Sequence, residues 1–348
     1  MVFELYDEAG LAKFLSKVDE LLKDYLTEKN FYPSTSEPRD LYEYARKRVL
    51  GPGKKFRPAL ALATCKVFSE GEMQKALPWA AAIETDHAGL LDIDDYIDSS
   101  KLRRGEEATW IKIGYEKALV VGLMNCAAIP WACIYDGIVN FGWTQETSNY
   151  LLQLFYTMQK ETAEGEFLDI MYRKSRDLTK EKQKLIYLRK TGAYTLAAPA
   201  AGGAKIGGAD KKTADDLYAA LKINIGPGFQ MRDDIRNVTE RDLTKYGKEF
   251  GDDLNEGKPT YLVALFNEEA SEEDKDKFYK LFGRLNPPLS MEERNELVAL
   301  LEKYDVINKT KEESEEMLRY GMEIIKSILP QNENSKEFWS LLQYAIKW

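Results

Sequence analysis

The sequence predicts an all-α protein, and two patterns lead to that prediction. Long segments repeat apolar residues with the spacing of one helix face, and no segment alternates apolar and polar residues as a half-buried strand does. Clusters of glycine and proline separate these segments, as at Gly51, Pro52 and Gly53. The later helical segments are 116–140, 144–173, 180–191, 211–239, 260–267, 291–303 and 310–329.

The first hundred residues give the same result in more detail. Residues 1–30 form an amphipathic pattern, with Leu11, Leu15 and Val18 on one face. Residues 31–40 contain two prolines and are expected to be a loop. Further helices are expected over 41–50, about 59–68 and 77–96. The last of these is apolar on most sides, which is typical of a buried helix.

The apolar run over residues 118–135 has about the length of a short membrane span. It contains Asn125 and Pro130, and Lys117 and Asp136 flank it, so a buried central helix is favoured over a membrane span. The N-terminus has no basic segment followed by an apolar one, as a secretory signal would.

Two later segments have unusual composition. Residues 192–208 are dense in glycine and alanine, which permits close helix contact or a break. Residues 242–259 hold three lysines, five acids and three glycines with little apolar content, so a mobile loop is predicted there. No linker or repeat stands out, and one domain is expected over residues 1–348, with a motif-bearing core over about 41–330.

Composition narrows the class of protein. Of 348 residues, 44% are hydrophobic and 31% charged, and the formal net charge is -9. This balance argues against a general nucleic-acid or anionic-membrane surface, although local basic sites remain compatible with it. Three cysteines without CxxC spacing argue against a disulfide framework or a zinc site. A reducing, cytoplasmic location is therefore predicted.

The most informative segment runs from His87 to Arg104. Asp94, Asp95 and Asp98 have helical spacing, so at least two of the carboxylates share a face. Close carboxylates repel one another, which indicates a cation beside them. Arg103 and Arg104 follow little more than a turn later, so one surface could hold metal ions and anionic groups together.

A second acidic cluster lies at Asp233 and Asp234, between Gln230 and Asn237. With a single histidine in the chain, two such clusters favour a hard cation bound through carboxylate oxygens, as magnesium bridged to diphosphate is. Arginine and lysine suit the diphosphate oxygens. The basic residues that could serve are Lys54, Lys55, Arg57, Arg103, Arg104, Lys190, Lys248 and Lys258.

Each piece alone also has a structural interpretation. The acidic run could be a solvated helix end, the basic loop a turn, the paired arginines ordinary surface residues, and His87 a core or rim histidine. The order of the pieces favours function. Taken together, they resemble the trans-isoprenyl diphosphate synthase family over roughly residues 51–262. The matching segments are GPGKKFRP, HAGLLDIDDYIDSSKLRRG, GEFLD, KTGAY, GFQMRDDIRN and YGKEFGDDLNEGKPT.

The resemblance implies a single bundle of long antiparallel helices around a central cavity, the isoprenoid synthase fold, and a homodimer. It implies Mg2+ as cofactor, with isopentenyl diphosphate and an allylic diphosphate as substrates. Asp94, Asp95 and Asp98 match the first aspartate motif, whose outer members bind magnesium on the allylic diphosphate. Asp233 matches the leading metal ligand of the second motif.

The same resemblance assigns the basic and polar residues. Lys54, Arg57 and His87 fall where the family binds the diphosphate of isopentenyl diphosphate, and Lys55 stands where arginine is usual. Arg103 and Arg104 match a pair divided between the two diphosphates. The groups that match those beside the allylic diphosphate or the developing carbocation are Lys190, Thr191, Tyr194, Gln230 and Lys248. Lys258 matches a second lysine of the lid loop.

Two departures from the family pattern weaken parts of this assignment. Asn237 replaces a third aspartate, which should weaken the second metal site, and Arg236 adds charge beside it. Glu166 replaces the more usual glutamine, while Asp169 is kept. Activity is still expected.

Product length in this family depends on residues about one turn before the first aspartate, here Gly89 and Leu90. Small Gly89 leaves space, which favours products of twenty carbons or more. Asp86, one turn deeper, is an awkward neighbour for a hydrocarbon because burying an unpaired carboxylate is unfavourable. Aromatic side chains elsewhere could also close the cavity, namely Trp131, Phe155 and Tyr156.

Two other functions stay open at this point. A class I terpene cyclase ionises an allylic diphosphate in the same way. Its second metal motif requires a hydroxyl residue and then an acidic one, at positions where this chain has Asn237 and Arg241. A non-catalytic subunit could modulate an active homologue, although such a chain need not keep the aspartates and arginines that this one keeps.

Overall fold

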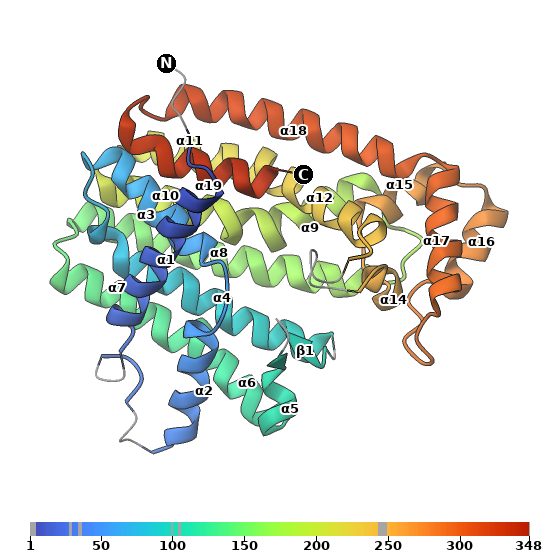
Figure 1. Ribbon diagram of the computed structural model, residues 1–348, viewed down its shortest axis with the longest axis horizontal. Coiled ribbons are helices and arrows are strands. Elements are labelled where there is room, and N and C mark those ends of the chain that lie inside the picture. The colour runs from blue at the N-terminus through green and yellow to red at the C-terminus, as the bar shows by residue number, and fades with distance from the viewer. Residues whose placement is uncertain are drawn as a thin grey trace. The chain divides into compact units, whose positions relative to one another are not determined.

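The computed structural model describes residues 5–27, 30–33, 37–98, 100–103, 106–242 and 249–347. This part of the chain is built from helices and one short two-stranded ribbon, which confirms the predicted all-α class (Figure 1). The chain divides into two compact units. The first comprises Met1–Tyr156, Ala198–Tyr218 and Ile328–Ala345, and the second comprises Thr157–Ala197, Ala219–Ser327 and Ile346–Trp348.

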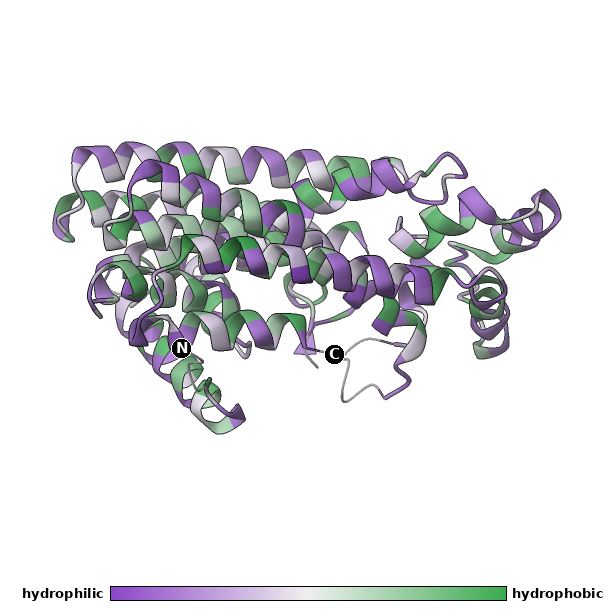
Figure 2. Ribbon diagram, turned by 90° about the horizontal axis from the view of Figure 1, so that it is seen from above, coloured by the Kyte–Doolittle hydropathy of each residue, from purple (hydrophilic) through white to green (hydrophobic). Residues whose placement is uncertain are grey.

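The first unit contains the N-terminal helices and the ribbon. Its elements are α1 Glu8–Tyr25, α2 Arg39–Leu50, α3 Phe56–Phe68, η1 Gln74–Ala76, α4 Leu77–Ile97, β1 Leu102–Arg103, β2 Glu106–Glu107, α5 Thr109–Ile113, α6 Tyr115–Leu123, η2 Met124–Ala128, α7 Ile129–Asn140, the start of α8 Gln145–Met171, α10 Ala198–Gly207, most of α11 Lys211–Ala220, η5 Glu333–Ser335 and α19 Lys336–Ile346. Figure 2 shows hydrophobic and hydrophilic residues alternating in short groups along most helices of the described chain.

α4 is a core helix that carries the first aspartate cluster at its C-terminal end. All residues from Pro78 to Gly89 are buried, as the apolar pattern predicts. The helix packs against α3, α6 and α7 of the same unit. Asp92 and Asp95 are buried as well, and the helix ends at Ile97. The core of this unit therefore fixes where the aspartates emerge.

The glycine- and alanine-rich segment forms helix rather than a break. In α10, Gly203 and Gly207 lie against the backbone of α3, and a Cβ atom added to Gly203 would fall 2.2 Å from the carbonyl oxygen of Ala61. Gly202 lies against the ring of Trp79 in the same way. The small residues thus allow the close contact between α10 and α3 that the composition permitted.

Residues Tyr115–Asn140 form one helical run made of α6, η2 and α7. The run is long and apolar enough to cross a membrane by length and composition alone, and 44% of its most apolar window is buried. Core helices of soluble proteins pass the same test, but this run is only partly buried in the structure. Large apolar side chains are exposed along the run, namely Leu119, Val120, Leu123, Trp131, Tyr135 and Val139.

The second unit contains the second aspartate cluster. Its elements are the end of α8, α9 Lys180–Tyr187, the π-helical η3 Leu188–Ala197, η4 Leu221–Ile225, α12 Gly226–Thr239, α14 Asp252–Glu256, α15 Tyr261–Glu269, α16 Glu272–Leu281, α17 Met291–Lys303 and α18 Val306–Ile328. Within it, α12 packs on α9, η3, η4 and α15. The predicted loop over 242–259 contains the short helix α14, and the five consecutive charged residues 272–276 belong to α16.

Candidate active site

The first aspartate motif contains one buried carboxylate and two that are partly exposed. Asp94 keeps 26% of its side chain exposed and Asp98 is partly exposed, whereas Asp95 keeps 1%. Because Asp94 and Asp98 are about one turn apart, they share a face of the helix end, and Asp95 points elsewhere. The shared face is the one that a ligand arriving from solvent can reach.

Two arginines compensate the buried charge. Arg103 Nε donates to Asp95 Oδ1 at 2.6 Å, and its Nη2 donates to Asp94 Oδ2 at 3.1 Å. Arg48, on α2, donates from Nη2 to Asp95 Oδ2 at 3.1 Å. Burial raises the pKa of Asp95, and the guanidinium of Arg103 opposes that rise. Arg48 was not among the predicted site residues.

Asp92 is a second residue that the predicted set omits. Its side chain is fully buried, its Oδ1 accepts a hydrogen bond from Thr109 Oγ1 at 2.8 Å, and the same atom lies 3.0 Å from Arg48 Nε. Burial raises the pKa of Asp92 to about 6, against the opposing charge of Arg48. Asp92 could have been noticed in the sequence as a carboxylate inside an apolar helix pattern. Its partner Arg48 lies on another helix, so the pairing was not visible there.

The donor set suits magnesium held together with a diphosphate. In the described part of the chain, no three His, Cys, Asp or Glu side chains gather closely enough to hold a metal ion by themselves. Magnesium at phosphate sites commonly uses one or two carboxylates and takes its other oxygens from substrate and water. Asp94 and Asp98 offer hard carboxylate oxygens of this kind, so the residues fit the ion.

The first turn of α3 and the core helix α4 bring together two of the predicted diphosphate ligands. Arg57 Nη1 lies 3.2 Å from His87 Nε2. Since a guanidinium can only donate, Nε2 is the accepting atom in this contact. Lys54 is exposed, and its ammonium lies 5.1 Å from the centre of the Tyr344 ring on α19. Lys54 is therefore accessible to an anion.

Lys55 does not fit the role assigned to it. Its side chain is 1% exposed, and Nζ donates to the carbonyl oxygens of Val49 at 2.6 Å and Gly51 at 3.1 Å. The third partner is Glu84 Oε1 at 3.2 Å. An ammonium has three donors, and all three are used. In this structure the Lys55 ammonium therefore fixes the backbone before α3.

The residues predicted to set product length have an unexpected environment. A Cβ atom on Gly89 would fall 2.5 Å from the carbonyl oxygen of Gly122 and 2.5 Å from Cys126 Sγ. The room that Gly89 leaves is thus occupied by η2 and the end of α6. Asp86 is buried and Leu90 is partly exposed.

The aromatic residues considered as plugs differ in their surroundings. Phe155 is fully buried and meets the rings of Trp79 and Trp131 edge to face. Tyr156 is 57% exposed.

The second unit holds a continuous hydrogen-bonded chain of predicted residues. Thr191 Oγ1 donates to Gln230 Oε1 at 3.1 Å, and Gln230 Nε2 donates to Asp234 Oδ1 at 3.2 Å. Asp234 also accepts from the Tyr187 hydroxyl and from the backbone N–H of Tyr261 at 3.2 Å. Burial raises the pKa of Asp234 to about 7, and Asp253 adds to the rise. This buried network orients Thr191 and Gln230.

Lys190 lies on the π-helical segment η3, a geometry often found at functional sites. Its Nζ is 2.9 Å from Glu166 Oε2 and 3.3 Å from Asp169 Oδ2. A Cβ atom on Gly165 would fall 2.2 Å from the Lys190 backbone nitrogen, so α8 and η3 approach closely here. Glu166 therefore lies beside a predicted catalytic lysine. Tyr194, on the same segment, is partly buried.

Asp233 is partly exposed on α12, while Asn237 is completely buried. Asn237 Oδ1 accepts a hydrogen bond from the Asp253 N–H at 3.2 Å, and its backbone oxygen accepts from Gly251 at 2.7 Å. The amide thus ties the start of α14 to α12, which gives the departure at Asn237 a structural reason.

Two predicted residues cannot be placed. Arg104 and Lys248 lie outside the described residues. Lys258 is described, and its Nζ lies 2.7 Å from Glu256 Oε2.

Solved structures share this fold. The geranylgeranyl pyrophosphate synthetase of Pyrococcus horikoshii matches 97% of this chain and 98% of its own, with a TM-score of 0.84 and 28% identity. A geranylgeranyl pyrophosphate synthase of Corynebacterium glutamicum, complexed with isoprenyl diphosphate and magnesium, matches 97% of this chain and 99% of its own, with a TM-score of 0.83 and 25% identity. The fold is the all-α isoprenoid synthase fold, and the protein is a prenyltransferase by class.

Sequence similarity narrows the class to a family. A short chain isoprenyl diphosphate synthase of Methanothermobacter thermautotrophicus is 29% identical over 274 residues, 78% of this chain and 79% of that protein. The profile of the polyprenyl synthetase family matches residues 38–301. The chain belongs to the polyprenyl synthetase family and is a trans-prenyl diphosphate synthase. The family uses magnesium and isoprenyl diphosphate substrates.

Proposed function

We propose that this chain condenses isopentenyl diphosphate with an allylic diphosphate and makes an all-trans prenyl diphosphate of twenty carbons or longer. The observation that carries the proposal is the division of the first motif. Asp94 and Asp98 present accessible carboxylates on one helix face, while Asp95 is buried against arginine. This arrangement suits a metal-bound diphosphate on the accessible side.

Magnesium ions, when bound, would neutralise the diphosphate and make it a better leaving group. Asp94 and Asp98 supply carboxylate oxygens for them, and Asp233 is assigned a metal-binding role by resemblance. Lys190 binds the allylic diphosphate, and Lys248 is assigned to the same group by resemblance. Departure of the diphosphate breaks the carbon–oxygen bond and leaves an allylic carbocation.

Oxygen dipoles of this chain then act on the cation without reacting with it. The Thr191 hydroxyl and the Gln230 amide are held by their mutual hydrogen bond and by Asp234, so they need no reorganisation. Tyr194 is assigned to the same region. The double bond of isopentenyl diphosphate attacks the cation to form the new carbon–carbon bond, and a proton leaves with the released diphosphate.

The second substrate is held by the basic loop. Lys54, Arg57 and His87 bind the diphosphate of isopentenyl diphosphate, and the Arg57–His87 contact sets the imidazole orientation. Arg103 and Arg104 are divided between the two diphosphates. Lys258 acts in the loop beside the allylic diphosphate.

Product length rests on different support than the size of Gly89. Leu90, which is partly exposed, carries no aromatic ring that would close a cavity, and relatives with this fold include geranylgeranyl pyrophosphate synthases. Purified protein should be incubated with magnesium, isopentenyl diphosphate and each allylic primer in turn. Linear products of twenty carbons or more are expected; products of fifteen or fewer would refute the length. No elongation would indicate a modulating subunit, and cyclic hydrocarbon a cyclase.

The same proposal includes a cytoplasmic homodimer. The exposed apolar side chains of the Tyr115–Asn140 run, such as Leu123 at 61% and Tyr135 at 68%, would be covered by a second copy. All three cysteines are free thiols, which suits a reducing compartment. Light scattering should give the mass of two chains, and Leu123→Glu should shift it toward one chain. A monomer in the unchanged protein would contradict the dimer.

A further inference from the structure

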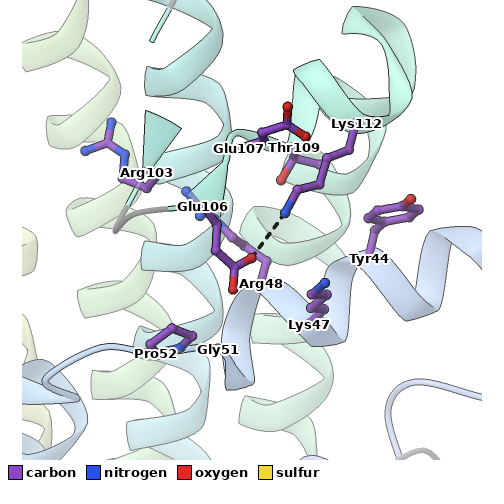
Figure 3. Close-up of a pocket in the computed structure, with 10 residues that line it drawn as sticks. All are labelled: Tyr44, Lys47, Arg48, Gly51, Pro52, Arg103, Glu106, Glu107, Thr109 and Lys112. Atoms are coloured by element: carbon purple, nitrogen blue, oxygen red, sulfur yellow. Dashed lines mark hydrogen bonds and ion pairs between the residues drawn. The ribbon is translucent and has the colours of Figure 1, made fainter. Parts of the chain in front are cut away.

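An ion cluster behind the first aspartate motif joins three carboxylates to two guanidinium groups. Asp92, Asp94 and Asp95 lie on the last turns of α4, and Arg48 and Arg103 reach them from α2 and from β1. Figure 3 shows both arginines at the small pocket beside this cluster, where Thr109 is another lining residue.

The two oxygens of Asp95 are divided between the arginines. Oδ1 accepts from Arg103 Nε at 2.6 Å, and Oδ2 accepts from Arg48 Nη2 at 3.1 Å. Arg103 also holds Asp94, the partly exposed carboxylate. In this structure Arg103 therefore occupies a carboxylate proposed to hold magnesium.

If Arg103 binds a diphosphate, as the proposed function has it, its bonds to Asp94 and Asp95 must break. Asp94 can then take a metal ion, but Asp95 is 1% exposed and cannot be solvated by water. Without Arg48, Asp95 would then be a buried carboxylate with no counter-charge, which is strongly unfavourable. Arg48 is the cation that can stay.

Arg48 is anchored independently of Asp95. Its Nε lies 3.0 Å from Asp92 Oδ1, which is in turn fixed by the Thr109 hydroxyl at 2.8 Å. The side chain of Asp92 is fully buried and that of Arg48 is 15% exposed. The planar guanidinium can bridge two carboxylates, which the ammonium of a lysine does less well.

We propose that Arg48 is a positioning residue of the first aspartate motif: it holds Asp95 through Oδ2 and so frees Arg103 to exchange Asp94 and Asp95 for the allylic diphosphate. The inference rests on the proposed synthase function. Its consequence is specific to ligand binding. Removing Arg48 should disfavour the diphosphate-bound state more than the free state, because only the free state keeps Arg103 on Asp95.

The alternative is that Arg48 only neutralises Asp92. A double variant separates the two roles, because Arg48→Met with Asp92→Leu removes the buried pair together and leaves no stranded charge at residue 92. If Arg48 acts only on Asp92, the double variant should recover both the melting temperature and the substrate constants of the unchanged protein. If Arg48 positions Asp95, the melting temperature should recover while diphosphate binding stays weak.

The experiment compares the unchanged protein with Arg48→Met, Arg48→Lys and the double variant. Two constants are measured: the KM for the allylic diphosphate and the Kd for inorganic diphosphate with magnesium, by calorimetry. Arg48→Met and the double variant should both raise the Kd by about tenfold or more, equal to about 1.4 kcal/mol. Arg48→Lys should recover part of that loss. The KM for isopentenyl diphosphate should change little.

Lys205→Met is the matched control in the same unit. Lys205 is a buried cation whose partners are Glu146 Oε1 at 2.6 Å and the Ala209 carbonyl oxygen at 3.3 Å, and neither residue belongs to the proposed site. It should lower the melting temperature and leave both constants unchanged. Recovery of the Kd in the double variant, or an unchanged Kd in Arg48→Met, would overturn the inference. Failure of the unchanged protein to elongate any primer would instead overturn the proposed function, and the diphosphate Kd would still decide the role of Arg48.

Discussion

Replacing Gly89 with alanine tests whether this residue serves helix packing or product length. The new Cβ atom would lie 2.5 Å from the Gly122 carbonyl oxygen, 2.5 Å from Cys126 Sγ and 2.7 Å from the Cys126 nitrogen. These distances are about 1 Å shorter than ordinary contacts. Two of the three atoms belong to backbone, so helices must move apart rather than one side chain turning. Overpacking of this kind typically destabilises by about 1–3 kcal/mol.

The assay is urea denaturation of Gly89→Ala together with chain-length analysis of its product. Gly122→Ala is a graded control, since its Cβ would meet Ile93 at 3.1 Å and the Gly89 oxygen at 3.3 Å, and should destabilise less. Cys126→Ala combined with Gly89→Ala should recover only part of the stability, because the Gly122 oxygen remains. A Gly89→Ala protein with unchanged stability and shorter products would refute this reasoning and return Gly89 to the cavity wall.

Further predictions concern metal binding, the basic loop and pH. Asp94→Ala should lower kcat by roughly a hundredfold or more, because a lost metal ligand removes several kcal/mol of leaving-group stabilisation; near-normal turnover would place the metal elsewhere. Lys55→Met should destabilise by about 3–5 kcal/mol in urea denaturation, since Glu84 would be left buried without a counter-charge. A higher KM for isopentenyl diphosphate at unchanged stability would contradict that. A hydrogen bond from Lys303 holds the pKa of Asp274 well below its ordinary 3.8. The ionised form therefore stabilises the fold above about pH 4, and this is lost as pH falls toward the lowered pKa, so the stability difference from Asp274→Asn should shrink in acid; a constant difference would contradict it.

The helices were predictable because their apolar periodicity is local. The predicted core helix over 77–96 is α4, Leu77–Ile97, and the segment over 291–303 is α17, Met291–Lys303. The charged α16 was missed because charge dominates its composition, while Phe278 alone is fully buried among its aromatic residues. The π-helical turns of η3 were also not predictable, since the pattern of apolar residues does not distinguish one helix type from another.

Residues of the candidate site could be predicted only where their spacing or their match to a family motif pointed to them. The partners of those residues lie on other elements, so their identity depends on tertiary structure. Arg48 lies in the helix predicted over 41–50, and only the fold brings it to Asp92 and Asp95. The surroundings of Lys55 and Gly89 were unpredictable for the same reason. Their types suggested a ligand and a space, but Lys55 turns inward and Gly89 meets a neighbouring helix.

The end of α4 breaks a general rule of helix electrostatics, and the ion cluster explains how it can. The C-terminus of a helix carries partial negative charge, so carboxylates there are unfavourable. α4 has no basic residue in its last turn, yet it carries Asp92, Asp94 and Asp95. The guanidinium groups that offset them come from outside the helix, on Arg48 and Arg103. The carboxylates at this helix end are stabilised by cations from other elements. One of these cations can therefore be replaced by a metal ion without unfolding the helix end, provided that the other stays in place.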